Sequence, residues 1–260
     1  MRTWIGYIAA AGLIAGAASS AQAANWTLDF NELQRGEIVN NQYASGIPGA
    51  SSTSVVISAI GGIDGSNLAV AFDTNNATTG SNNGFGSNGG DSDLAHPFRN
   101  NSTNFGNILI VQEQATAGTT SCGPGGSATC INDPIIPDDD IGSWLTFDFE
   151  DTPAHLKSID YFDIENYYSQ RAYLKIYYAD GSPMVTQQLA PTGNHKHGVF
   201  AFGDLGKNVA ILKVKFKGSG AVDNLMGYEK TTQVTEPQTL AILLTGLAGL
   251  ALYRRRRQKA

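Results

Sequence analysis

Residues 210–217 read Ala-Ile-Leu-Lys-Val-Lys-Phe-Lys, and this stretch decides the fold class. Apolar residues alternate with lysines along it: Leu212, Val214 and Phe216 against Lys213, Lys215 and Lys217. A period of two residues points successive side chains to opposite faces of a β-strand. We therefore expect a strand with one buried apolar face and one solvated lysine face.

The same alternation recurs through the middle of the chain, where no stretch shows sustained helical periodicity. In residues 173–178, two aliphatic residues alternate with tyrosines and a lysine. Further strands are predicted at 26–30, 55–59, 68–72, 107–112, 146–149 and 161–165, with a hairpin turn at 179–182. Many short strands separated by Gly, Asn and Asp predict an all-β fold, an antiparallel β-sandwich of jelly-roll type. The polar segment 73–104 is predicted to be a long surface loop.

The N-terminal residues have the pattern of a signal peptide. Arg2 precedes an almost entirely apolar run at 4–18, and Ala21-Gln22-Ala23 gives a small-x-small cleavage site. An N-terminal membrane anchor is the alternative, but the run is short and ends in small and polar residues. We predict a signal peptide at 1–23 and a mature chain beginning at Ala24.

The C-terminal residues have the pattern of a membrane stop signal. Glu236-Pro237 precedes an apolar run at 240–253, which ends in Arg254, Arg255, Arg256 and Arg257. Arginines after an apolar segment stay cytoplasmic and keep the preceding chain outside. This arrangement resembles the PEP-CTERM sorting tail of Gram-negative bacteria, although Thr235 stands where that motif has its first proline.

The resemblance of the tail implies an address and a processing partner. It implies export across the inner membrane, transient attachment through a transmembrane segment at 239–253, and cleavage by an exosortase-type peptidase. The product would then be released to the cell surface or the extracellular space. The chain divides into the signal peptide, an ectodomain at 24–228, a linker at 229–234 and a sorting tail at 235–260.

The charge of the trimmed chain excludes one class of partner. Residues 24–235 hold 11 basic and 22 acidic groups, a net charge of −11 with histidine neutral. Such a surface repels phosphate backbones, so we expect no nucleic acid partner. The same charge favours solubility and divalent cations.

Two cysteines, Cys122 and Cys130, flank a glycine-rich loop. In an exported chain an even pair this close is predicted to be joined as a disulfide. A metal-binding cysteine pair is the alternative, but no nearby histidine completes a zinc set.

The order of short motifs in the ectodomain gives a second resemblance. LDFNELQRG at 28–36 is followed by Asn41-Gln42-Tyr43, and much later by residues 107–110, 137–140 and 220–225. This pattern is similar to the jelly-roll ectodomains that accompany such sorting tails and that resemble carbohydrate-binding modules. The resemblance implies non-catalytic binding of polysaccharide in an exopolysaccharide or biofilm setting. A structural matrix protein without a specific small ligand is the alternative, and a glycan-active enzyme is a third.

Oxygen-rich side chains at both ends of the ectodomain suggest calcium. Asp29 and Glu32 lie near the first predicted strand, and Asp223 with Asn224 lies in the last. The first and last strands of a jelly roll are commonly neighbours, and Ca²⁺ takes six to eight oxygen ligands. We predict a structural calcium at Asp29, Glu32 and Asp223. The alternative is that each carboxylate caps a turn or faces water.

Tyrosines are the candidate sugar-binding residues. If the aliphatic residues of 173–178 point inward, Tyr173 and Tyr177 share the opposite face, and Tyr161 joins them if its strand is adjacent. A flat ring offers an apolar surface to the C–H side of a pyranose. The alternative is that these tyrosines only cover the second face of the sandwich.

Catalytic patterns find little support in this sequence. Asp163 and Glu165 alternate onto one face of a predicted strand, as in a glycosidase pair, yet such neighbours are usually a polar surface. His195 and His197 lie on one side of an extended segment, but a third zinc ligand cannot be assigned. We predict that the protein is not an enzyme.

The tail generates a first prediction. The apolar run of 14 residues spans about 21 Å as a helix, short of the roughly 30 Å hydrocarbon core, so the attachment is marginal and suits removal. In cells that contain the peptidase, fractionation and mass spectrometry should find a mature form cut near Glu236-Pro237. A mature form that still carries Arg254–Arg257 would contradict the predicted processing.

Overall fold

The computed structural model describes residues 24–61, 67–76, 94–112, 119–131, 142–149, 151–165, 171–218 and 220–229. All of them fall within Ala23–Lys230. The predicted signal peptide at 1–23 and the predicted sorting tail at 235–260 lie outside the described residues, as does the ectodomain motif at 137–140.

The described residues form an all-β fold. Its strands, in chain order, are β1 (Asn25–Leu28), β2 (Val56–Ile60), β3 (Ala69–Asp73), β4 (Asn107–Val111), β5 (Thr119–Cys122), β6 (Ala128–Ile131), β7 (Trp144–Asp148), β8 (His155–Phe162), β9 (Tyr173–Tyr178), β10 (Val185–Gln188), β11 (His197–Ala201), β12 (Val209–Lys215) and β13 (Ala221–Tyr228). The helical segments among these residues are short 3-10 turns: η1 (Thr74–Asn76), η3 (Pro124–Gly126) and η4 (Gly203–Gly206).

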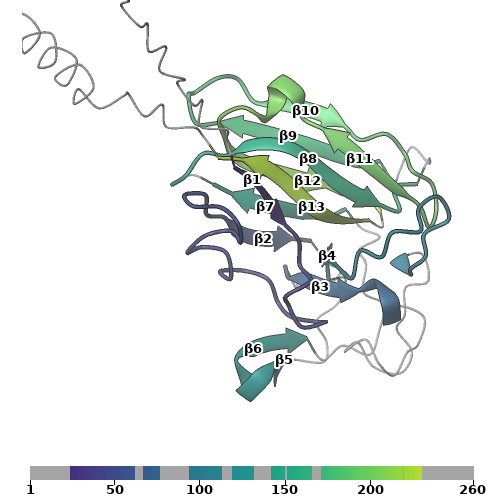
Figure 1. The fold of residues 1–260 in the computed structure, drawn as a ribbon. Coiled ribbons are helices and arrows are strands. Elements are labelled where there is room, and N and C mark those ends of the chain that lie inside the picture. The colour runs from purple at the N-terminus through teal and green to yellow at the C-terminus, as the bar shows by residue number, and fades with distance from the viewer. Residues whose placement is uncertain are drawn as a thin grey trace, which may run out of the picture. The chain divides into compact units, whose positions relative to one another are not determined.

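The strands pair antiparallel in two sheets and one hairpin. The first sheet has the order β11-β8-β13-β4-β3, with β1 also pairing with β13, and the second sheet has the order β10-β9-β12-β7-β2. Strands β5 and β6 pair with each other, and Figure 1 shows their hairpin below β3. The prediction of an antiparallel β-sandwich is therefore confirmed.

The core between the sheets follows from the period of two. In the second sheet, the residues at alternate positions are buried: Ile57, Ala59, Leu145, Phe147, Leu174, Ile176, Leu212 and Val214. They pack against side chains of the first sheet such as Trp26, Leu28 and Leu225 in one hydrophobic cluster. Burial of this area from water is the main driving force that holds the sheets together.

The first sheet is covered on its outer face as well. A second hydrophobic cluster joins Phe72, Ile108 and Phe162 on that face to Phe98 and Phe105 from the segment 94–105. This double coverage explains why β3 and β4 are continuous apolar runs rather than alternating ones. The predicted surface loop at 73–104 is exposed at residues 97, 99, 100 and 102–104, but Leu94 and Phe98 are buried, and Phe98 is only 3% exposed.

Two strands for which the sequence predicted no range, β10 and β11, are edge strands. β10 and β11 lie at the ends of their sheets, and their residues are half-buried or exposed rather than alternately buried. An edge strand packs fewer apolar side chains, so the periodic signal is weak. The strand predicted at 161–165 begins earlier and ends at Phe162.

The Cys122–Cys130 disulfide is present, as predicted, and closes the β5–β6 hairpin with a Cα–Cα distance of 5.7 Å. The hairpin is joined to the first sheet through residues 36–39. On one side Ile38 N donates to Thr129 O (2.9 Å), and on the other Val39 N donates to Ala69 O (2.8 Å). The disulfide therefore stabilises a hairpin that extends the first sheet, and not only a surface loop.

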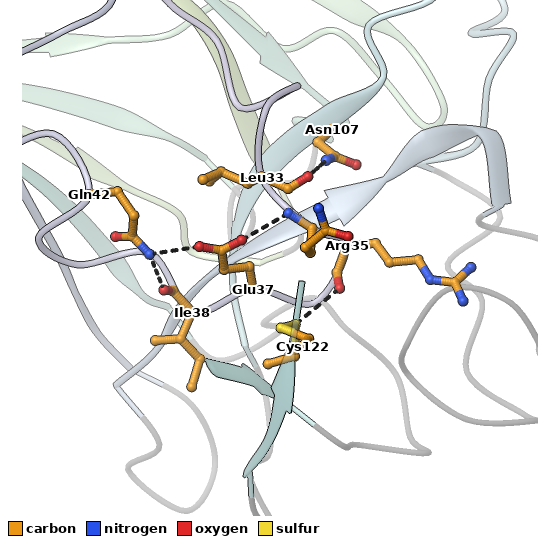
Figure 2. The surroundings of a disulfide bond; sticks show 9 residues. Leu33, Arg35, Glu37, Ile38, Gln42, Asn107 and Cys122 are labelled. Carbon is orange, nitrogen blue, oxygen red and sulfur yellow. Dashed lines mark hydrogen bonds between the residues drawn. A yellow bond between two sulfur atoms is a disulfide. The ribbon is translucent and has the colours of Figure 1, made fainter. Parts of the chain in front are cut away.

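A buried carboxylate holds this connecting segment in place. Glu37 is buried and accepts hydrogen bonds from Gln34 N (2.9 Å) and Gln42 Nε2 (3.2 Å). Figure 2 shows the Gln42 amide between the Glu37 carboxylate and the Ile38 carbonyl, to which it also donates (2.7 Å). In the same view Asn107 donates to Leu33 O (2.8 Å), so β4 is fixed to the start of the segment.

The folded domain extends one residue beyond the predicted boundary at 228. Glu229 N donates to Ala24 O (2.8 Å), so the first and last described residues pair. The Glu229 carboxylate is buried and accepts hydrogen bonds from Ser51 N (2.6 Å), Ser51 Oγ (2.6 Å), Ser52 N (3.0 Å) and Ser52 Oγ (2.9 Å). Glu229, the first residue of the predicted linker, is thus part of the folded domain.

We predict that Glu229→Ala destabilises the protein by about 1–3 kcal/mol, because donors of Ser51 and Ser52 lose a charged acceptor. Burial raises the pKa of Glu229, but the hydrogen bonds from Ser51 and Ser52 together bring that pKa below its ordinary value of 4.5. The stabilisation is thus present above about pH 4.5 and is lost as pH falls further. Thermal unfolding of the full-length protein from pH 3 to 7 measures it. Asp204→Ala, at an exposed acidic residue, is the control, and equal profiles for both variants would contradict the role.

Candidate functional site

The outward side chains of the second sheet gather aromatic rings and lysines on one face. We call this set the lysine–aromatic face, and it consists of Trp144, Tyr173, Lys175, Tyr177, Lys213, Lys215 and Lys217. Lys217 is exposed and the others are partly exposed, whereas the residues that alternate with them are buried. The structure therefore brings Tyr173 and Tyr177 together on one face, opposite the aliphatic residues of β9.

The strand register places the members of the face side by side. Lys215 lies between Trp144 on β7 and Tyr173 on β9, so these three residues form one row. In the next row Lys213 lies directly opposite Lys175. Side chains paired in this way on one face of a sheet are within contact distance.

Each lysine of the face has its ammonium against a ring. Lys175 Nζ and Lys215 Nζ both lie 4.9 Å from the centre of the Trp144 ring. Lys213 Nζ lies 5.7 Å from the Tyr177 ring centre, and Lys217 Nζ lies 5.6 Å from that of Tyr173. These are cation–π distances, so the rings hold the ammonium groups in defined places. Trp144 was not among the predicted ligand-binding residues, because its part in the face depends on the register of three strands.

Tyr161 does not join this face, and that prediction is wrong. It lies in β8, which belongs to the first sheet, and its side chain is 5% exposed in the core between the sheets. Burial raises the pKa of Tyr161 above its ordinary value. The alternation at 161–165 predicted the side of the strand on which Tyr161 lies. It did not predict which of the two sheets the strand joins.

The first and last strands are neighbours, as the calcium prediction required. β1 pairs with β13 from Leu28, opposite Leu225, to Asn25, opposite Tyr228. On the same edge of β13, Ala221 and Val222 pair with β4 instead. Asp223 and Asn224 lie where the partner of β13 changes from β4 to β1.

Asp223 is a buried carboxylate without compensation. Its side chain is 1% exposed, and neither oxygen accepts a hydrogen bond of normal geometry from the described residues. Burial raises the pKa of Asp223 well above its ordinary value, the neighbouring Asp160 and Asp29 raise it further, and the Asn224 backbone amide lowers it by less than burial raises it. A cation beside these oxygens would remove the cost of the buried charge.

Asp160 is a further carboxylate close to Asp223, and the sequence did not indicate it. It lies opposite Asp223 in the β8–β13 register. Its carboxylate is already partnered, because Asn224 Nδ2 donates to Oδ2 (2.9 Å) and His197 Nε2 lies 3.3 Å from Oδ1. Asp160 lies in β8 just before the strand predicted at 161–165, and residues 155–160 show no clear alternation in the sequence.

The three predicted calcium ligands are only partly brought together. Asp29 is close enough to Asp223 to affect its pKa, whereas Glu32 is exposed and acts on Tyr43, whose pKa is raised first by burial and next by Glu32. Tyr43 donates from its hydroxyl to Asp29 O (3.2 Å). No group of three or more His, Cys, Asp or Glu side chains among the described residues is arranged to hold a metal ion. A calcium at Asp223 and Asp29 would therefore need carbonyl, amide or water oxygens as well.

Asp163 and the histidines have structural partners. Asp163 follows the end of β8, and its Oδ1 accepts the backbone N–H of His195 (2.6 Å). His195 Nε2 lies 2.6 Å from Ala95 O, and His197 Nδ1 lies 3.0 Å from Asn101 Nδ2. Both imidazoles thus attach the segment 94–105 to the first sheet. Glu165 instead lines a shallow pocket of about 160 Å³ with Arg171 and Gln188.

The residues of the predicted sorting motif, Glu236, Pro237 and Arg254–Arg257, lie outside the described part of the chain. Within the described ranges, no helix is both long and apolar enough to span a bilayer.

Comparisons with known proteins do not assign a function to the lysine–aromatic face or to Asp223. No family model and no curated protein matches this chain. Among solved structures, the chain is similar to allantoicase from Saccharomyces cerevisiae, with 16% sequence identity and a TM-score of 0.25. That match covers 62% of this chain and 40% of the allantoicase chain. A likeness of this size identifies neither a family nor an activity, so the class of the protein is that of its fold, an antiparallel β-sandwich.

The raised pKa of Asp223 predicts the direction in which the stability of the protein changes with pH. Since its pKa is raised in the folded protein, stability without a cation should fall as pH rises above the ordinary value of 3.8 and toward the raised one. In Asp223→Asn this part of the pH dependence should disappear. Thermal unfolding in chelator from pH 4 to 8 measures the difference, with Asp204→Asn as the control at an exposed site. Identical profiles for the parent and Asp223→Asn would show that the buried charge is already compensated.

Proposed function

We propose that the described domain is a non-catalytic, jelly-roll-like module of an exported protein, and that it binds polysaccharide through the lysine–aromatic face. The observation that carries this proposal is the gathering of Trp144, Tyr173 and Tyr177, each partly exposed, on one open sheet face. Aromatic rings and a few polar groups on a surface are the usual means of holding a sugar ring.

The surroundings of the rings support a sugar ligand over a purely apolar one. Thr146, Thr186 and Gln188 occupy outward positions of the same sheet and supply hydroxyl and amide groups. These groups, together with the lysines, are donors and acceptors for sugar hydroxyls. A flat, open face holds each sugar weakly. Retention would therefore depend on many copies meeting one polymer, where linked sites raise the apparent affinity.

Calcium is the proposed structural cofactor. Asp223 and Asp29 would hold the calcium ion, with Glu32, three residues after Asp29, as a further carboxylate. The ion would place a positive charge beside the buried Asp223 carboxylate. Asp223 belongs to the first sheet and the tyrosines to the second. We therefore expect calcium to act on stability and only indirectly on binding.

The predicted address agrees with this function. An exosortase-type peptidase and the inner membrane are the proposed processing partners. The released protein would then meet extracellular polysaccharide at the cell surface of a Gram-negative bacterium.

The test is the retention of full-length protein, solubilised in mild detergent, on a panel of polysaccharides with and without chelator. Tyr173→Ala and Tyr177→Ala should each weaken retention several-fold and leave the melting temperature nearly unchanged, since both side chains are partly exposed. Tyr228→Ala, at a partly exposed tyrosine of the first sheet, is the matched control and should bind like the parent.

Two results would count against the proposal. If the parent is retained but both tyrosine variants match it, the lysine–aromatic face is not the site. If the parent is retained on none of the polysaccharides, the protein is better described as a structural matrix component that acts by bulk association.

A further inference from the structure

The lysine–aromatic face concentrates positive charge on a domain that is strongly acidic. Residues 24–235 carry 11 basic and 22 acidic side chains. Four of the basic ones, Lys175, Lys213, Lys215 and Lys217, lie on this face. Among the described outward positions of the second sheet, Asp148 is the single acidic residue. The charge of the face is therefore opposite in sign to that of the domain.

We infer that the face binds an acidic polysaccharide, one whose sugar units carry carboxylate groups. The inference rests on the proposed function and narrows it to a class of polysaccharide. It is carried by charge complementarity and by the way in which the rings position the ammonium groups.

The arrangement of the lysines lowers the stability of the unbound protein, because two positive charges face each other. Lys213 and Lys175 lie directly opposite each other on β12 and β9. Like charges at such positions destabilise a sheet. The two ammonium groups are drawn apart, one toward Tyr177 and the other toward Trp144, but both remain on the same face. A bound anion between them would relieve the repulsion.

The rings hold the ammonium groups before any ligand arrives. A lysine side chain is long and flexible, and immobilising it on binding costs conformational entropy. Here each of the four ammonium groups already lies 4.9–5.7 Å from a ring centre. Part of that entropy is lost on folding, so the face is preorganised for negative groups.

The same contacts disfavour neutral sugars. A neutral pyranose that stacks on Trp144 has to compete with the two ammonium groups against that ring. A sugar with a carboxylate can instead pair with an ammonium and leave the cation–π contact in place. The occupied rings therefore favour an acidic ligand over a neutral one of the same shape.

The face has the extent of a polymer site. One row runs across four strands through Trp144, Lys215, Tyr173 and Gln188. At about 4.8 Å between strands, this row is about 14 Å long. It ends at Gln188, which also lines the pocket that contains Arg171 and Glu165. A short run of sugar units fits such a row better than a single sugar does.

A nucleic acid is a less suitable anion for this site. The net charge of −11 for residues 24–235, in which the four lysines are already counted, repels a densely charged phosphate chain at long range. A polyuronate has a lower charge density and offers sugar C–H faces to the rings.

The experiment compares two polymers that differ mainly in charge. Polygalacturonate and its fully methyl-esterified form share one backbone, and the ester removes the carboxylate charge. Full-length protein in mild detergent should bind polygalacturonate at least about tenfold more tightly than the ester, which corresponds to roughly 1.4 kcal/mol. The difference should shrink as NaCl rises from about 0.05 to 0.5 M, because screening shortens the range of the charges.

Paired lysine variants locate the effect. Lys175→Gln combined with Lys215→Gln should reduce binding of polygalacturonate at least about tenfold and leave the melting temperature unchanged or raised, since repulsion on the face is relieved. Lys157→Gln combined with Lys207→Gln removes the same charge from the first sheet and from the turn after η4, and should bind like the parent.

The outcomes separate this inference from the proposed function. Equal binding of the two polymers, unaffected by the paired lysine variants, overturns the acidic ligand and keeps polysaccharide binding. Binding to neither these polymers nor the wider panel overturns both. Equal or tighter binding of duplex DNA at the same salt concentration overturns the inference in favour of a general polyanion site.

Discussion

Burial of the inward residues of the second sheet fixes both the core and the surface of this protein. Leu212 and Val214 on β12, with Leu174 on β9, are fully buried against the first sheet. Because side chains alternate along a strand, this burial forces Lys213, Lys215 and Tyr173 outward. A slip of one residue in either strand would bury lysines and expose leucines. The face that we propose for binding is thus specified by the hydrophobic core beneath it.

A second constraint lies at the centre of the first sheet, where one edge of β13 is shared by two strands. β4 pairs with the start of β13 and β1 with its end, so the ladder is interrupted beside Asp223 and Asn224. Asn224 adopts a positive φ of 45° there, and the register against β8 shifts between Asp223 and Met226. The backbone irregularity and the uncompensated carboxylate occur together. A cation would relieve the uncompensated charge, and the strands beside the irregular backbone, β4 and β8, are held by their other neighbours, β3 and β11.

The sequence predicted the sandwich because its central strands alternate strictly, as in residues 173–178 and 210–217. It predicted the hairpin turn at 179–182 but no range for β10, and it did not indicate β11, because the edge positions of these strands leave them without a buried face. It also placed Tyr161 wrongly, since alternation assigns a residue to one side of a strand and does not say which sheet the strand joins. The pairing of Trp144 with Lys175 and Lys215 depends on the register of three strands from distant parts of the chain. Local patterns carry no such information.

The pairing of Glu229 with Ala24 has a mechanical consequence. β13 leads directly to Glu229 and is hydrogen-bonded on both sides, to β8 on one and to β1 and β4 on the other. A pull on the chain beyond Glu229 is transmitted along β13, so several backbone hydrogen bonds share the load at once. The four hydrogen bonds from Ser51 and Ser52 to the Glu229 carboxylate are the first to carry it. A domain attached by its C-terminal end and loaded by a polymer on its second sheet would resist extraction through its most central strand.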